Sequence, residues 1–150
     1  MKFPKFKLED QQGNTITNKD LGEWSIIYFY PKDNTSGCTI EAKDFTQLLP
    51  KFKKLNAKVF GLSPDSKESH CKFIDKQELK LQLLSDPEKQ LLQALDCWIE
   101  KSMYGRKYMG VNRSTFLVKN NEIIHEWRKV KVPSHANEVL EILKKYQQSS

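Results

Sequence analysis

The spacing of apolar residues along the chain predicts a sheet with buried central strands. Segment 24–30 (WSIIYFY) is a nearly unbroken run of β-branched and aromatic residues, and segment 57–62 (AKVFGL) is a second such run. Runs of this kind are typical of central strands that are buried on both faces. Segment 3–21 is short and turn-rich, and its Gln12-Gly13-Asn14 stretch has the composition of a hairpin tip. We therefore expect two short strands followed by two central ones.

A helix is expected between the two central strands. It is predicted to begin near residues 35–38, with Thr35 or Ser36 as the N-cap, because short hydroxyl side chains favour that position. Its apolar face would consist of Phe45, Leu48, Leu49, Phe52 and Leu55. Pro50 lies inside this pattern. Because proline lacks a backbone N–H and clashes with the preceding turn, we expect it to kink or break the helix.

The rest of the chain predicts alternating elements and a closing hairpin. The expected elements are a helix over 66–77, a short strand over 81–84, a helix over 86–95, strands over 114–118 and 122–127, and a helix over about 133–147. Asn120-Asn121 forms the turn between the last two strands. Helices alternate with strands before an antiparallel hairpin ends the sheet, which predicts a mixed α/β fold with helices on both faces.

Length and composition indicate one folded domain. The chain has 150 residues, which is enough for one domain with a hydrophobic core and too few for two. Apolar residues make up 38% and charged residues 29%, which is typical of a globular chain. No apolar run is long enough to cross a bilayer, and segment 1–20 lacks the apolar core of a signal peptide. We therefore expect a single domain over 1–150 in the cytoplasm.

The basic charge of the chain raises the question of nucleic acid. The formal net charge is +6, but the basic residues are spread along the chain and most are interleaved with core-type residues. A solvated lysine surface accounts for this pattern better than a nucleic-acid footprint does. We expect neither a nucleic-acid partner nor a membrane partner.

The cysteines and histidines do not form a metal or disulfide pattern. The cysteines are Cys38, Cys71 and Cys97, and the histidines are His70, His125 and His135. An odd, sparse set without a C-x-x-C pair argues against a disulfide framework, a structural zinc site and a thioredoxin-type dithiol. The histidines are not spaced like metal ligands. We therefore expect no metal and no other cofactor.

Segment 31–41 (PKDNTSGCTIE) carries the candidate chemistry. It joins the end of a buried strand to the start of a helix, where reactive groups collect in open α/β sheets. Cys38 falls in the first helical turn, where unpaired N–H groups and the helix dipole favour the nucleophilic thiolate. Thr35 can reach back across the same turn. On position alone, Cys38 could equally be a small buried residue, Thr35 only an N-cap and Glu41 only a first-turn acid.

This segment resembles the peroxiredoxin signature P-x-x-x-T-x-x-C, which Pro31, Thr35 and Cys38 match. It is most similar to the bacterioferritin-comigratory, or PrxQ, subfamily. Segments 61–70 (GLSPDSKESH), 103–110 (MYGRKYMG) and 110–118 (GVNRSTFLV) resemble the same subfamily in the same order. The resemblance covers nearly the whole chain. It implies a thioredoxin-like fold and the thiol-dependent reduction of hydrogen peroxide and organic hydroperoxides.

The resemblance also implies roles for individual residues. Cys38 matches the cysteine that attacks the peroxide, Thr35 matches the hydroxyl that orients it, and Pro31 matches the residue that shields the thiolate. Arg113 matches an arginine that reaches the thiolate from a distant loop. Its guanidinium group could donate hydrogen bonds to both the sulfur and a peroxide oxygen. Glu41 matches a position that is often Glu or Gln beside this site.

One position departs from the subfamily pattern. Many PrxQ members carry a resolving cysteine where this chain has Lys43, so the common disulfide within one helix is impossible. Some relatives carry that cysteine in the next helix at the position of Ile74, one turn beyond Cys71. The remaining candidates are Cys71, Cys97 and a thiol from outside the chain. We favour Cys71, with a one-cysteine mechanism that uses an external thiol as the alternative.

The implied cycle oxidises the cysteine to a sulfenic acid, which a second thiol converts to a disulfide. Thioredoxin or a glutaredoxin/glutathione system would then reduce it, in a monomer or weak homodimer. Two alternatives remain from the sequence. One is a thiol–disulfide oxidoreductase, against which the missing C-x-x-C counts. The other is a non-catalytic redox-sensing or holdase module on the same fold, which would keep Cys38 without turnover.

Overall fold

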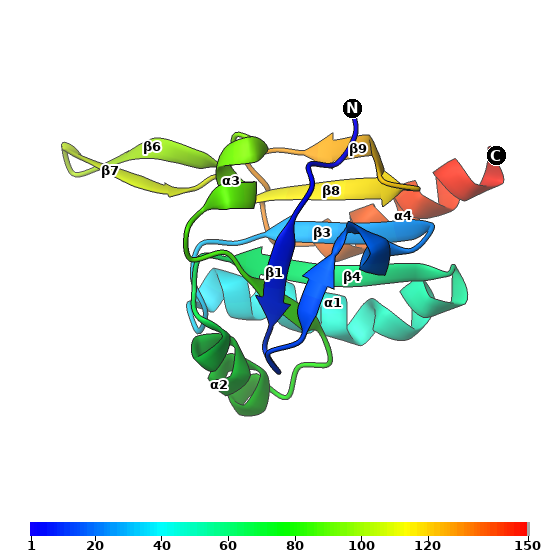
Figure 1. The fold of residues 1–150 in the computed structure, drawn as a ribbon, viewed down its shortest axis with the longest axis horizontal. Coiled ribbons are helices and arrows are strands. Elements are labelled where there is room, and N and C mark those ends of the chain that lie inside the picture. The colour runs from blue at the N-terminus through cyan, green and yellow to red at the C-terminus, as the bar shows by residue number, and fades with distance from the viewer. Residues whose placement is uncertain (150) are drawn as a thin grey trace.

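The structure is a computed structural model and describes residues 1–149. Its first elements are β1 (Lys7–Asp10), β2 (Thr15–Thr17), the 3-10 helix η1 (Asn18–Leu21), β3 (Trp24–Phe29), α1 (Ser36–Lys54), β4 (Ala57–Ser63) and α2 (Lys67–Gln77). The later elements are β5 (Gln82–Ser85), α3 (Gln90–Ala94), β6 (Trp98–Met103), β7 (Arg106–Val111), β8 (Ser114–Lys119), β9 (Glu122–Trp127) and α4 (His135–Gln148). The predicted α/β class is confirmed (Figure 1).

Seven strands form a mixed central sheet in the order β2-β1-β5-β4-β3-β8-β9. Strands β3, β4 and β5 run parallel, whereas β1 is antiparallel to β5, and β8 and β9 close the other side in antiparallel pairs. The carboxyl ends of β3 and β4 therefore lie next to each other on one side of the sheet, which is the edge at which ligands bind in α/β sheets. Because Phe29 pairs with Ser114, the residue that precedes β8 also arrives at this edge.

Strand β3 is buried on both faces because its alternate side chains enter two different cores. Ile26 and Tyr28 pack with helices α1, α2 and α4 on one face. Ile27 and Phe29 pack on the other face with α3 and the N-terminal strands. This two-sided burial explains the continuous apolar run in the sequence. It also confirms the prediction of helices on both faces.

Helix α1 differs from the expectation at Pro50. We expected a kink or a break there; the helix is continuous from Ser36 to Lys54, so the break is wrong. Proline removes one backbone hydrogen bond, but the turn that follows is held by the fully buried Phe52, whose ring lies 6.1 Å from that of Phe45. Tertiary packing of this kind supplies most of the stability of a helix within a protein and here offsets the local cost of the proline.

The hairpin of β6 and β7 has no counterpart among the predicted elements. Trp98 pairs with Val111 at its base and Met103 with Arg106 at its tip, where Tyr104 and Gly105 both have positive φ angles of 51° and 78°. Such a pair of φ values is typical of a tight two-residue hairpin turn. The ribbon projects from the body of the molecule in Figure 1. Its largely exposed side chains explain why no buried-strand pattern marked it.

No helix in residues 1–149 combines the length and the apolar character that a bilayer crossing requires.

The close packing around Gly61 in β4 yields a first prediction. A Cβ atom there would lie 2.7 Å from Leu83 Cδ2 and 2.9 Å from Tyr28 Cζ, both in fully buried side chains. Gly61→Ala should therefore lower the free energy of unfolding by about 1–3 kcal/mol, measured by urea denaturation. Gly37→Ala is the control, because its Cβ would meet only Arg113 Nη2 at 3.6 Å. A Gly61→Ala variant as stable as the wild type would contradict this packing.

Candidate active site

Cys38 lies in the first turn of α1, at the edge of the sheet where β3 ends. Its side chain is buried, with 1% of its surface exposed. The Thr39 N–H donates to the Thr35 carbonyl at 2.9 Å, and the N–H groups before it lack an intrahelical partner. The positive end of the helix dipole therefore faces the thiol and favours a negative charge there.

Arg113 reaches this turn from the residue just before β8, the strand that pairs with β3. Its Nη2 donates to Cys38 Sγ at 3.1 Å, and its Nη1 pairs with Glu41 Oε1 at 2.5 Å. Cys38 and Glu41 both lie on the buried face of α1, and each is about 1% exposed. The antiparallel pairing of β8 with β3 delivers Arg113 across 75 residues of sequence. A guanidinium group placed in this way stabilises a thiolate through a charge-assisted hydrogen bond.

Glu41 is an unusual acid in this site because it is buried beside the arginine. Burial raises the pKa of Glu41 from 4.5 to about 7, and the charge and hydrogen bonds of Arg113 oppose this rise only in part. Its second oxygen, Oε2, has no hydrogen-bond partner among the described residues. Because that oxygen has lost its hydration without gaining a hydrogen bond, burial disfavours the charged carboxylate and raises the pKa.

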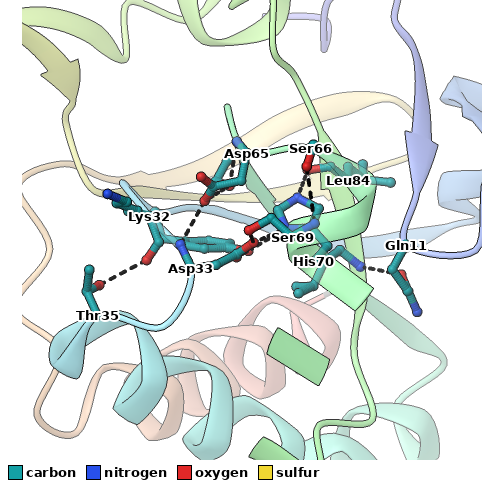
Figure 2. Close-up of polar contacts among 12 residues, drawn as sticks. Gln11, Lys32, Asp33, Thr35, Asp65, Ser66, Ser69, His70 and Leu84 are labelled. Carbon is teal, nitrogen blue, oxygen red and sulfur yellow. Dashed lines mark hydrogen bonds and ion pairs between the residues drawn. The ribbon is translucent and has the colours of Figure 1, made fainter. Parts of the chain in front are cut away.

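Thr35 and Pro31 border the site on its loop side. Thr35 is the N-cap residue of α1, as expected, but its side chain makes no capping hydrogen bond. Instead its hydroxyl group donates to the Lys32 carbonyl oxygen at 2.9 Å, as Figure 2 shows. The hydroxyl oxygen therefore keeps lone pairs that can accept a hydrogen bond from a ligand. Pro31 follows β3 and is half-buried.

A buried polar cluster that the sequence analysis missed lies beside the loop. Asp33 Oδ2 lies 2.7 Å from His70 Nδ1 and also accepts from Ser69 Oγ at 2.7 Å. Asp33 Oδ1 accepts from the Tyr30 hydroxyl, and the Asp33 N–H donates to Asp65 Oδ2. In Figure 2 the side chains of Asp33, Ser69 and His70 point toward one another from the loop and α2. Spacing along the sequence carries no signal for them, because Asp33 and His70 are 37 residues apart.

The ligand atoms of Asp33, Asp65 and His70 lie close enough together to hold a metal ion. Each is already engaged in hydrogen bonds. Asp65 Oδ2 accepts from the Ser63 hydroxyl as well as from Asp33 N, and His70 Nε2 faces the Leu84 carbonyl oxygen at 2.9 Å. The cluster is therefore organised as a hydrogen-bond network.

The other two cysteines lie in different surroundings from Cys38. Cys71 is exposed on α2, immediately after His70, whereas Cys97 is fully buried. Cys97 Sγ lies 3.5 Å from Arg128 Nη1, and burial raises the pKa of its thiol. All three cysteines within the described residues are free thiols. The structure thus brings Arg113 and Glu41 to Cys38 but does not bond Cys71 to it.

Comparison with known proteins gives consistent matches over most of the chain. The sequence profile of the AhpC/TSA family matches residues 1–127. "Peroxiredoxin Bcp" of Bacillus subtilis (strain 168) is 46% identical over 145 residues, which cover 95% of this chain and 92% of that protein. "Peroxiredoxin Bcp" of Xanthomonas campestris pv. campestris is 48% identical over 131 residues, which cover 87% of this chain and 82% of that protein.

Solved structures share the same architecture. The bacterioferritin comigratory protein of Xanthomonas campestris, whose alkyl peroxide reduction activity has been studied through trapped intermediate and ligand complexes, superposes with a TM-score of 0.89. It is 44% identical in sequence, and the match covers 94% of this chain and 91% of that one. The overall fold is therefore shared with structures of this family.

The buried carboxyl group gives a prediction about pH. Because the folded-state pKa of Glu41 is raised, its contribution to stability is complete below about pH 4.5 and is lost as the pH rises through about 7. Glu41→Gln keeps a neutral side chain at every pH. The free energy of unfolding of the variant, relative to wild type, should therefore increase by on the order of 1–3 kcal/mol between these two pH values.

Urea denaturation at a series of pH values would measure this difference. Glu141→Gln, at an exposed position of α4, is the matched control and should follow the wild type. If Glu41→Gln and wild type change in parallel across the window, the carboxyl group does not titrate there.

Proposed function

This chain belongs to the AhpC/TSA family as a thiol peroxidase of the Bcp, or PrxQ, type, and we propose that Cys38 is the thiol that attacks the hydroperoxide. The observation that carries this proposal is the 3.1 Å contact between Arg113 Nη2 and Cys38 Sγ. Of the three cysteines, Cys38 also has the helix dipole directed at it. A hydrogen bond from a cation and the dipole together favour the thiolate, which is the nucleophilic form.

The first half of the cycle is a displacement at oxygen. The thiolate donates an electron pair to the terminal oxygen of R–O–O–H, the O–O bond breaks, and the S–O bond of a sulfenic acid forms. The departing alkoxide takes up a proton and leaves as the alcohol, or as water from hydrogen peroxide. Arg113 can donate to an oxygen of the peroxide, and Thr35, whose own proton is used on Lys32, can accept from its O–H group. Pro31 would shield the thiolate on the side of β3.

The second half of the cycle reduces the sulfenic acid. We propose that Cys71 displaces water from it to form a disulfide, which a dithiol reductant such as thioredoxin, or a glutaredoxin/glutathione system, then reduces. Cys71 is exposed, as an attacking thiol must be, whereas Cys38 is buried. A disulfide needs Cα atoms within about 7 Å, which two intact helices rarely allow, so bonding would require local unwinding near Cys38 or Cys71. The proposed setting is the cytoplasm, with the enzyme acting as a monomer or weak homodimer.

Peroxide consumption with dithiothreitol as reductant tests the role of Cys38. Cys38→Ser should abolish turnover, because a hydroxyl group cannot supply the thiolate, while the far-UV circular dichroism stays that of the wild type. Continued turnover in Cys38→Ser would reject the assignment. A wild type that consumes one equivalent of peroxide and then stops would favour the redox-sensing module over the enzyme.

Arg113 and Arg128 form a matched pair for testing the cation. Both lie beside a cysteine, Arg113 at Cys38 and Arg128 at Cys97. Arg113→Ala should slow peroxide reduction by roughly 100-fold or more, as expected for loss of one preorganised donor at a reacting atom. Arg113→Lys should recover part of the rate, since it keeps the charge but loses the planar fork. Arg128→Ala should leave the rate near that of the folded wild type, and equal effects of the two alanine variants would contradict the proposal.

The role of Cys71 is tested by trapping the sulfenic acid. After one equivalent of peroxide, wild type should yield a linked peptide that contains Cys38 and Cys71. Cys71→Ser should instead accumulate Cys38 labelled by dimedone, whereas Cys97→Ser should behave as wild type. Equal dimedone labelling in all three proteins, without a linked peptide, would show that an external thiol resolves the sulfenic acid.

A further inference from the structure

We propose that Asp33 and His70 are positioning residues of the peroxidase site, because they fasten the loop before Cys38 to the start of α2. The inference rests on the proposed function, and it goes beyond it by assigning a task to two residues that touch no reacting atom. We call Asp33, Ser69 and His70 the loop clamp. Figure 2 shows the three side chains converging on one point between the loop and α2.

Asp33 and His70 of the loop clamp are buried, and all three of its side chains are hydrogen-bonded. The side chains of His70 and Asp33 are 0% and 2% exposed. Asp33 accepts from Tyr30 at the end of β3 at 2.5 Å and from Ser69 and His70 in α2 at 2.7 Å each. A single carboxylate thus ties together the strand that precedes the loop and the helix beside it.

Both ring nitrogens of His70 are engaged in hydrogen bonds. His70 Nε2 lies 2.9 Å from the Leu84 carbonyl oxygen, which can only accept, so Nε2 carries a proton. His70 Nδ1 lies 2.7 Å from Asp33 Oδ2, and this short contact requires a proton between the two atoms. Asp33 also accepts from the hydroxyl groups of Tyr30 and Ser69. Hydrogen bonds therefore hold both members of the Asp33–His70 pair in place.

The segment that follows Asp33 has few other ties. Asn34 has a positive φ angle of 61°, and the Thr35 side chain bonds only back to Lys32 within the same loop. No side chain caps the start of α1. The clamp at Asp33 and the Arg113 contact at Cys38 are therefore the two attachments between which residues 34–37 are held. If the clamp is released, the loop loses its fixed end and Cys38 is no longer held against Arg113.

The same clamp fixes the start of the helix that carries Cys71. His70 precedes Cys71 directly, and it is the inward-facing partner of that exposed residue. Asp33 lies five residues before Cys38, so one hydrogen-bonded pair joins the chain near each of the two thiols. The clamp thus determines where the loop pivots when the first turn of α1 opens, namely after Asp33.

Asp33→Asn and His70→Asn test the clamp without touching the reacting atoms. The test measures two rates. The first is the rate of peroxide reduction. The second is the rate at which a bulky maleimide alkylates Cys38, measured in proteins that also carry Cys71→Ser. Displacement of a reacting group by about 1 Å can cost on the order of 100-fold in rate, so each variant should lose at least tenfold in peroxide reduction. Alkylation of Cys38, followed by peptide mass spectrometry, should accelerate by roughly tenfold or more, because the loop opens more often.

Val118→Ala controls for a general loss of stability. Val118 is buried in the core that also contains Ile27 and Phe29. It pairs with Ser25 near the start of β3, at the end of the strand that is remote from Cys38. It should lower global stability to urea without accelerating Cys38 alkylation. Ser69→Ala, which removes one of the hydrogen bonds to Asp33, should have a smaller effect of the same kind and serves if the stronger variants do not fold.

The double variant Asp33→Asn/His70→Asn separates a pair from two independent residues. If the two act as one clamp, its alkylation rate should equal that of the more affected single variant. Alkylation no faster than in Val118→Ala would overturn the proposal, as would slower peroxide reduction at an unchanged alkylation rate. Alkylation of Cys38 does not depend on turnover. The proposal about the clamp can therefore be rejected while the wild type remains a peroxidase, and the peroxidase assignment can be rejected while the clamp is upheld.

Discussion

The pairing of β8 with β3 is the constraint on which the site depends. It sets Ser114 opposite Phe29 and so brings Arg113 to the edge where β3 ends and α1 begins. Without that register, a buried thiol and a buried carboxyl group on α1 would have no counter-charge, and burial of an unpaired charge is costly. Arg113 contacts Cys38 through Nη2 and Glu41 Oε1 through Nη1, so one guanidinium group serves both. The long-range sheet pairing therefore accounts for the local chemistry of the helix.

Burial of this site serves one half of the proposed cycle and opposes the other. The Cys38 side chain is 1% exposed, and its contact with Arg113 is stronger in such an environment than in water. A sulfenic acid buried in the same place, however, is shielded from an exposed thiol such as Cys71. The helix start lacks a side-chain cap, and this absence lowers the cost of unwinding its first turn. The first turn of α1 is thus less stabilised than the central sheet, and this is the turn that moves in the proposed cycle.

The sequence predicted those parts of the fold in which burial is nearly continuous. Strands β3 and β4 were predictable because both of their faces enter a core, and segment 31–41 because it combines a strand end, a helix start and a matched signature. The β6–β7 hairpin was missed because it is largely exposed and has no buried face to impose a pattern. The expected break at Pro50 was wrong because the low helix propensity of proline does not take into account the tertiary packing of Phe52. The Asp33–His70 pair was missed because a contact between distant polar residues leaves no periodic trace.

Two polar contacts of different character hold the segment around Cys38, and in the proposed cycle their difference would set the order of the steps. The Arg113 side chain is 16% exposed and contacts the sulfur itself, so the proposed oxidation of Cys38 would change that contact directly. The Asp33–His70 pair is almost entirely enclosed and does not include the sulfur, so the proposed oxidation would not act on it directly. A sulfenic acid carries no charge for Arg113 to stabilise, and the first turn of α1 is then held less firmly than the loop that precedes it. Opening should therefore begin at the sulfur and stop at Asp33, which keeps the helix that bears Cys71 beside the released segment.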